Sequence, residues 1–372
     1  MKKIFIILFL FVFIKYSLSF SKNSDNQFYI IKQIPSTSIK NQAYTSTCWS
    51  FSVLAFLEAE LLKNGKGEFD LSEMYIVRNA YIEKAIKYVR MHGQIKFTSG
   101  GELNDPIEII KKFGIVPEIV YPGLKPNQKL HNHTAMDYEL KKYIENIVSK
   151  SGDSLPSDWL DVFISKLDSF LGTVPDSFQY NSVYFTPQSF RDYLGLNLDD
   201  YVLLTSFTHH PFYNGFALEI PDNWIWGIYY NIPLNEYNDV IKNSINSNCP
   251  VAFSVDITEK GFSRQNGIAI IDKNQKFNSE IDYTLFQYLR QKEFDNYKTQ
   301  DDHGMLIVGM ASDDNGNNYY VVKNSWGEND GKNNGIYYIS ESYFLMKSIC
   351  ILVNKNTIPK NIYNKISWCS YK

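Results

Sequence analysis

The chain has 372 residues, of which 44% are hydrophobic, 21% are charged and 16% are aromatic. This length and composition predict a sizeable hydrophobic core in two domains or one large two-lobed unit, and they exclude a mainly disordered chain. The formal net charge is −3 and no block of basic residues occurs, which argues against a dedicated nucleic-acid-binding surface.

The first 19 residues are typical of a secretory signal peptide. Lys2 and Lys3 precede an uninterrupted apolar run from Ile4 to Ile14, and Ser17 and Ser19 occupy the two positions that a signal peptidase inspects. We therefore expect cleavage after Ser19 and export to the periplasm or the medium. The apolar run is short for a stable membrane span, and a retained signal anchor is the alternative.

A short N-terminal arm over residues 20–38 leads to an apolar run that begins at Cys48 and reaches Leu62 without Gly or Pro. Its hydrophobic residues recur at helical spacing, so we predict a largely buried helix of about four turns. Cys48 lies in the first turn, where free backbone N–H groups and the macrodipole favour negative charge. We therefore expect its thiol to ionise readily. Gln42 lies six residues upstream and can offer an amide donor to an oxyanion beside the sulfur.

Further helices are predicted along the first half of the chain. Asp70 or Ser72 can cap a helix that runs to about Arg90, and residues 104–113 form a second one closed by Gly114. Helical patterns also cover residues 137–149, 160–171 and the segment after Pro187. We expect a helical lobe over residues 39–200, with an insertion at about residues 124–200.

The glycine pair Gly100 and Gly101 lies between two of these helices. Glycine tolerates positive φ and lets another chain approach closely. An ordinary loop is the structural alternative for this pair.

The second half is rich in strand-like segments separated by turns. They cover residues 201–206, 224–232, 251–257, 305–310, 319–323 and 335–339, with a helix at 234–246. A helix-rich half followed by a strand-rich half predicts an α+β fold with two lobes, the β-rich lobe covering residues 201–355. Residues 313–318 resemble a calcium loop, but they lack the terminal Glu and join two strands, which favours a hairpin turn.

We expect neither a metal nor a cofactor. The four cysteines, Cys48, Cys249, Cys350 and Cys369, have no spacing typical of zinc or of a disulfide framework. Cys249 and Cys350 are interpreted as buried core thiols. The histidines at 131, 133, 209 and 210 are in polar settings without an acidic or Cys partner at ligand spacing.

Three segments in a fixed order resemble the papain-like cysteine peptidases, within them most closely the bleomycin hydrolase and aminopeptidase C branch. They are Gln42 with Cys48-Trp49-Ser50-Phe51, then Asp302-His303-Gly304-Met305, then Lys323-Asn324-Ser325-Trp326-Gly327-Glu328. The resemblance implies a papain-like two-lobed fold, with Cys48 on the helical lobe and His303 and Asn324 on an antiparallel, barrel-like β lobe. It also implies hydrolysis of peptides or proteins, with aminopeptidase character, and a homo-oligomer, a hexamer in that branch.

The resemblance assigns roles to the residues of these motifs. Cys48 is the expected nucleophile and His303 the general base and acid, as a thiolate–imidazolium pair. Asn324 would orient the imidazole. Gln42 and the backbone N–H of Cys48 would form the oxyanion hole.

The substrate-binding residues are also implied by the resemblance. Gly100 and Gly101 would bind the main chain of the substrate, and Trp49 and Trp326 are the other expected substrate-binding residues. Trp326 would also shield the bond between imidazole and amide. One departure from the family pattern is Gly304, where Ala is usual; we expect it to loosen the turn after the base.

The C-terminal tail over residues 356–372 bears on the mode of cleavage. In the resembled branch this arm enters the cleft, blocks its nonprimed side and holds the free amine of the substrate with its terminal carboxylate. Here Lys372 adds a positive charge that would repel an ammonium. A papain-like endopeptidase and a catalytically idle scaffold or binding shell are therefore kept as alternatives.

Overall fold

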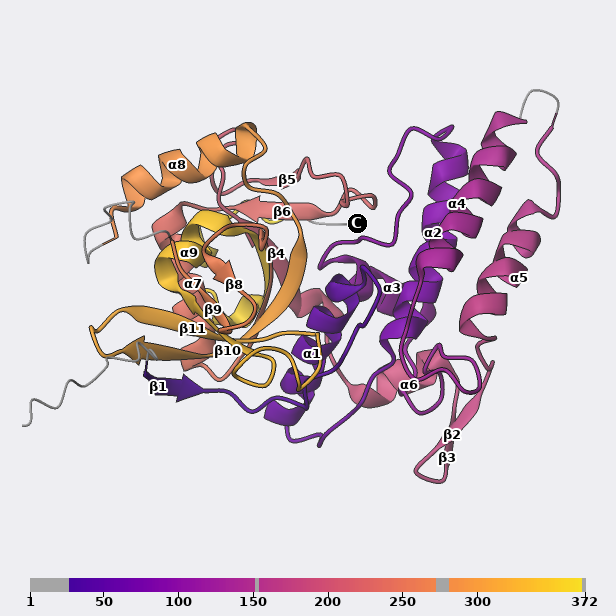
Figure 1. Ribbon diagram of the computed structural model, residues 1–372, viewed down its shortest axis with the longest axis horizontal. Coiled ribbons are helices and arrows are strands. Elements are labelled where there is room, and N and C mark those ends of the chain that lie inside the picture. Colours follow the sequence, from indigo (N-terminus) through magenta and orange to yellow (C-terminus); the bar gives the residue numbers. More distant parts are fainter. Residues whose placement is uncertain (1–26, 151–153, 272–280, 370–372) are drawn as a thin grey trace, which may run out of the picture.

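The computed structural model describes residues 27–150, 154–271 and 281–369. The predicted signal peptide lies outside these residues. Among them, none of the helices is both long enough and apolar enough to cross a membrane. Figure 1 shows a helical lobe on one side, a sheet-containing lobe on the other, and helix α1 between them.

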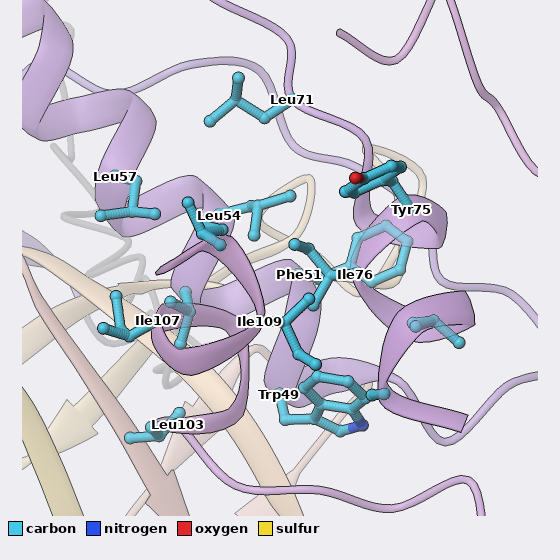
Figure 2. Close-up of a cluster of buried hydrophobic side chains, with 14 of the residues drawn as sticks. Trp49, Phe51, Leu54, Leu57, Leu71, Tyr75, Ile76, Leu103, Ile107 and Ile109 are labelled. Carbon is cyan, nitrogen blue, oxygen red and sulfur yellow. The ribbon is translucent and has the colours of Figure 1, made fainter. Parts of the chain in front are cut away.

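Helix α1 (Cys48–Lys63) is the central element of the core. Every residue from Trp49 to Leu61 is buried, because helices α2 (Glu73–Arg90) and α3 (Asp105–Phe113) cover one side and strands β7 (Val251–Val255) and β10 (His303–Asp313) cover the other. Figure 2 shows Trp49, Phe51 and Leu54 of this helix among side chains of the neighbouring helices. The predicted buried helix is present as expected, and its packing fixes the position of Cys48 at its start.

The helical lobe follows the predicted pattern closely. The Ser72 side chain caps α2 by accepting a hydrogen bond from the N–H of Tyr75, and Gly114 ends α3 with a φ of 82°. The predicted insertion contains α4 (Thr134–Ser149) and α5 (Trp159–Leu171), which pack against α2, then α6 (Pro187–Leu194). A short hairpin of β2 (Phe178–Tyr180) and β3 (Val183–Phe185), which was not predicted, precedes α6.

The second lobe is built on one sheet with the strand order β5-β6-β4-β13-β7-β10-β11-β12-β9-β8 within the described residues. The bounds not yet given are β4 (Tyr201–Thr205), β5 (Gly215–Ala217), β6 (Ile228–Asn231), β8 (Phe262–Ser263), β9 (Ile268–Ala269), β11 (Asn318–Lys323), β12 (Ile336–Ser340) and β13 (Ser348–Asn354). Most pairs are antiparallel as predicted, but β4 with β6 and β12 with β9 are parallel. Helices α7 (Leu234–Asn246), α8 (Tyr283–Asp295) and α9 (Glu341–Lys347) complete the lobe.

Three local predictions need correction. The strand expected over residues 224–232 begins only at Ile228, because Asn223 holds the preceding residues in a turn through its bond from the N–H of Gly227. Part of the expected N-terminal arm is strand β1 (Phe28–Gln33), which pairs with β10. Helix α8 was not predicted, although Asp282 supplies a typical N-cap to the N–H groups of its first turn.

The segment at residues 313–318 and the C-terminal tail have different local structures. Residues 313–318 form the predicted hairpin turn, with Asp313 accepting hydrogen bonds from the backbone N–H groups of Asn315 and Asn317. The tail forms a short helix, α10 (Lys360–Tyr363), and the ring of Trp368 then packs on Tyr230 of β6. Residues 370–372 lie outside the described residues.

Candidate active site

Cys48 occupies the first position of α1, where the strand that carries His303 touches the helix. The residue is half-buried, and its sulfur accepts hydrogen bonds from the backbone N–H groups of Gly304 and Trp49. Gly304 lies within β10, and a Cβ there would be 2.9 Å from Ser52 Oγ and 3.2 Å from Cys48 O. The expectation of a loosened turn is therefore wrong, because Gly304 brings a strand close to the start of α1.

His303 and Asn324 form a buried pair. His303 Nε2 lies 2.7 Å from Asn324 Oδ1, and the same oxygen accepts a hydrogen bond of 2.8 Å from the N–H of Ser325. Because an amide oxygen only accepts, the proton of the neutral imidazole is on Nε2. Nδ1 then carries the free lone pair and can accept a proton.

Trp326 lies over this pair. Its ring stacks on the imidazole of His303 with centroids 4.7 Å apart and an angle of 30° between the planes. The guanidinium of Arg264 lies 4.4 Å from the centroid of the indole. The predicted shielding position of Trp326 is thus the one that the structure shows.

Gln42 is held beside Cys48 by two segments. Its Oε1 accepts a hydrogen bond of 2.6 Å from the hydroxyl of Ser325, and its Nε2 donates to Thr45 O at 2.7 Å. An amide nitrogen carries two hydrogens, so one N–H of Gln42 remains for a ligand.

Gly100 and Gly101 are close to side chains, which explains the need for glycine. Neither has a positive φ. A Cβ on Gly100 would lie 2.6 Å from Asp222 Oδ2, and one on Gly101 would lie 2.9 Å from the ring of Trp49. Trp49 is 2% exposed and donates its indole N–H to Ser99 O. Its buried side chain therefore positions the loop that contains Gly100 and Gly101.

Burial shifts the pKa of both Cys48 and His303 toward the neutral form. Burial raises the pKa of Cys48 to about 12, although the N–H groups of Gly304 and Trp49 act in the opposite direction. Burial also lowers the pKa of His303 to about 4, against the effect of the hydrogen bond to Asn324. For the isolated thiol, the loss of hydration therefore outweighs the start of the helix.

A cleft of about 560 Å³ runs between the two lobes at this point. Seven of the eight predicted site residues line it, and Asn324 lies buried behind His303. The lining residues among the predicted set are Gln42, Cys48, Trp49, Gly100, Gly101, His303 and Trp326. None of residues 356–369 of the tail contributes to the lining.

Comparison with known proteins agrees with this geometry. Residues 173–368 match the model of the Peptidase C1-like family. The chain belongs to the Peptidase C1-like family. This membership confirms the predicted enzyme class, a cysteine peptidase, and the matched region includes His303 and Asn324.

Curated relatives extend the similarity over most of the chain. Aminopeptidase C of Lactobacillus delbrueckii subsp. lactis is 24% identical over 375 residues, with 89% of this chain and 82% of the relative covered. Aminopeptidase C of Lactococcus lactis subsp. cremoris is 24% identical over 362 residues, covering 87% and 81%. The mitochondrial cysteine proteinase 1 of Saccharomyces cerevisiae is 22% identical over 397 residues, covering 93% and 80%.

The crystal structure of PepW from Lactobacillus rhamnosis HN001 superposes with a TM-score of 0.69 at 19% identity, covering 91% of this chain and 84% of that chain. The predicted α+β, papain-like fold is therefore confirmed.

The histidine interpretation needs one correction in this Peptidase C1-like chain. Glu219 lies within reach of His209 and His210, with Nε2 to carboxylate distances of 3.3 and 2.7 Å. This partner has no local sequence signal, because the fold, and not local spacing, brings the segments after β5 and β4 together. The cluster does not contribute to the lining of the cleft.

The other two histidines support the loop that leads to Cys48. The N–H of Tyr44 donates to His131 O at 3.1 Å, and the N–H of His133 donates to Tyr44 O at 3.2 Å. Both imidazoles are buried, and burial lowers the pKa of each to about 4. The two rings are therefore neutral in the folded protein at neutral pH.

We expect this burial to make the protein less stable in acid. Below a pH of about 6.5, the unfolded chain takes up protons that the buried rings of His131 and His133 cannot. This difference lowers the free energy of unfolding by up to about 3 kcal/mol per histidine as the pH approaches 4. Urea unfolding of wild type and His133→Gln between pH 7.5 and 4.5 measures the effect. The variant should gain stability relative to wild type as the pH falls, whereas the exposed control His92→Gln should follow wild type. Parallel curves for His133→Gln and wild type would contradict the expectation.

Proposed function

We propose that this chain is a thiol-dependent aminopeptidase that releases residues from the free amino terminus of peptides. The pair of His303 and Asn324, placed on the same cleft as Cys48, is the observation that carries the peptidase chemistry. The aminopeptidase mode is supported by the relatives from L. delbrueckii and L. lactis, both described as aminopeptidase C.

The chemistry begins with transfer of the Cys48 proton to Nδ1 of His303. Each group alone is costly to charge in this buried site, but the transfer creates two opposite charges side by side, which offsets part of the desolvation. The sulfur then attacks the carbonyl carbon of the scissile peptide. The remaining N–H of Gln42 and the backbone N–H of Cys48 stabilise the oxyanion.

The imidazolium next gives its proton to the leaving amine, and the acyl group remains on Cys48 as a thioester. Nδ1 of His303 then takes a proton from water, which attacks the thioester and releases the acyl product. Throughout, the hydrogen bond from Nε2–H to Asn324 holds the ring in one tautomer and orientation.

Peptide pairs with free and acetylated amino termini test this proposal. We expect the mature protein to remove residues from the free termini and to cleave the acetylated partners at least about 10-fold more slowly, because a charge-assisted contact to the ammonium is lost. Cys48→Ala is the matched inactive control. Equal internal cleavage of both members of each pair would reject the aminopeptidase mode.

An endopeptidase is the second candidate, because the described part of the tail does not line the cleft. Deleting residues 364–372 discriminates between the two. Gain of internal cleavage with loss of amino-terminal trimming supports a role of the tail in an aminopeptidase, and an unchanged, internally cleaving enzyme supports the second candidate.

We also propose export after cleavage at Ser19 and assembly into a homo-oligomer, a hexamer by resemblance. Amino-terminal sequencing of the protein from extracellular or periplasmic fractions tests the first. Light scattering of the purified protein tests the second.

A further inference from the structure

One part of the cleft is lined by carboxylates that the proposed mechanism does not use. Glu102, Asp222, Asp301 and Asp302 contribute to the lining, against Lys96 as the basic side chain among the described lining residues. A surplus of carboxylates in a partly closed space favours a cationic ligand. The position of these groups along the cleft decides which part of a substrate they meet.

The glycine pair marks the side of the cleft that holds the acyl part of a substrate. In the proposed mechanism His303 delivers a proton to the leaving amine, so the leaving group lies on the side of His303. Gly100 and Gly101 line the cleft beside Trp49 and are the expected contact for the acyl part. Asp222 contacts Gly100, and Glu102 directly follows Gly101. The acidic groups therefore lie beyond the acyl carbon, toward the amino terminus of the substrate.

A connection from the β lobe contributes Asp222 to the lining of this part of the cleft. We call residues 218–227, which join β5 to β6, the strap; Figure 1 shows this connection extending from the sheet toward the helical lobe. Asp222 of the strap forms an ion pair of 2.9 Å with Lys96, and Trp224 donates its indole N–H to Asp105 Oδ2.

The tip of the strap is held as well. Trp226, with a φ of 61°, places its ring 3.5 Å from Lys87 Nζ of α2. These contacts tie the strap to the helical lobe at several points, so Asp222 is held in place where it lines the cleft.

Glu102 is the most informative residue of the acidic group. It is 1% exposed, and its Oε2 accepts a hydrogen bond of 3.0 Å from Tyr229 OH, whereas no donor of the described residues reaches Oε1. Its neighbour is the carboxyl group of Asp301, which is half-buried and hydrogen-bonds to it. Two carboxyl groups in contact must share a proton or hold a cation between them.

Lys96 compensates only part of this negative charge. Its side chain is 44% exposed and pairs with Asp222, which is 18% exposed. Lys84 is buried beneath the loop, where it donates to Thr98 O at 3.1 Å and to Gly100 O. Asp301, in contact with Glu102, and the exposed Asp302 are therefore the remaining carboxylates of the lining that a ligand in the cleft can reach.

We propose that Asp301, together with Asp222 of the strap, binds a primary ammonium of the substrate, in the first place its free α-ammonium. The strap then limits how far the chain extends beyond the scissile bond, and the two carboxylates select an amino terminus at that position. This inference rests on the proposed peptidase function and names the residues that give it its exopeptidase mode. A lysine side chain carries the same cation and is the second source to be distinguished.

Three fluorogenic peptides test the assignment: one with a free amino terminus, its acetylated form, and an acetylated form with lysine before the residue at the scissile bond. We expect Asp301→Asn to lower kcat/KM by about 10- to 100-fold for the substrate whose ammonium it binds, since a charge-assisted hydrogen bond is lost. The neutral acetylated peptide should be cleaved at the wild-type rate. Loss on the free-terminus peptide identifies the α-ammonium, and loss on the lysine peptide identifies the side chain.

Charge variants around Asp301 test the sign of the effect, because removal of a positive charge and removal of a negative charge should act in opposite directions. Lys96→Gln should raise kcat/KM for the same substrate, and Asp222→Asn should lower it, whereas Asp314→Asn, an exposed carboxylate on the hairpin, should match wild type. Iodoacetamide titration of Cys48 checks that each variant has an intact site.

Unchanged ratios between the three peptides in Asp301→Asn, Asp222→Asn and Lys96→Gln would overturn the assignment while leaving the peptidase intact. A wild-type protein that cleaves none of the peptides would instead reject the proposed function itself.

Discussion

Replacing Cys48 with serine is expected to abolish peptide hydrolysis, with kcat/KM falling by roughly 10⁴-fold or more. The serine hydroxyl has nearly the same size, but it does not give up its proton to His303 as a thiol does, so the nucleophile is lost while the fold is kept. The measurement is kcat/KM on a peptide with a free amino terminus, together with the thermal unfolding temperature.

Thiol labelling provides the control for this variant. Cys249 and Cys350 are buried and Cys369 is exposed, so iodoacetamide at neutral pH should label Cys48 and Cys369 in the native protein. Cys369→Ser should keep full activity, because residue 369 lies outside the cleft. Activity that survives in Cys48→Ser, or a native Cys48 that resists labelling while the denatured chain is labelled, would contradict the nucleophile assignment.

Replacing His303 with glutamine should lower kcat/KM by about 10³-fold, within the range for loss of a general acid and base. A second effect follows from burial, which raises the pKa of the Cys48 thiol to about 12. Without the imidazole to accept its proton, the thiol should react with iodoacetamide only at strongly alkaline pH. The pH profile of alkylation therefore separates loss of the base from general damage to the site.

Asn324→Ala is the graded comparison for this prediction. It leaves the imidazole in place but removes the acceptor of Nε2–H, so we expect a smaller loss of about 10- to 100-fold from misorientation of the ring. His303→Gln that is still alkylated at neutral pH at the wild-type rate would show that another group takes the proton. A loss in Asn324→Ala as large as that in His303→Gln would show that orientation by Asn324 is as important as the base itself.

Contacts between residues of the two lobes could not be predicted from the sequence. Glu102 and Asp301 belong to different lobes, and nothing in either local segment indicates that they touch. Within the β lobe, local spacing likewise does not indicate the contact of Glu219 with His209 and His210. Such contacts depend on how the strap, the sheet register and α1 fit together, and local spacing carries no information on this.

The structural reason why glycine is needed at a position was also harder to predict than the importance of the position. Gly100 and Gly101 were recognised, but their need for glycine comes from the side chains of Asp222 and Trp49 rather than from positive φ. Strand β1 was missed because its pairing partner, β10, lies at the other end of the chain. Its apolar residues, Phe28 to Ile31, were the available signal.

The elements whose causes are local follow from the amino-acid sequence alone. The unbroken apolar run after Cys48 specifies a buried helix, the caps at Ser72 and Gly114 specify where helices begin and end, and the ordered motifs specify the chemical groups of the site. The electrostatics of those groups, in contrast, depend on how the two lobes pack together. Burial between two lobes raises the pKa of Cys48 more than the hydrogen bonds from the N–H groups of Gly304 and Trp49 lower it, because the loss of hydration disfavours the charged thiolate.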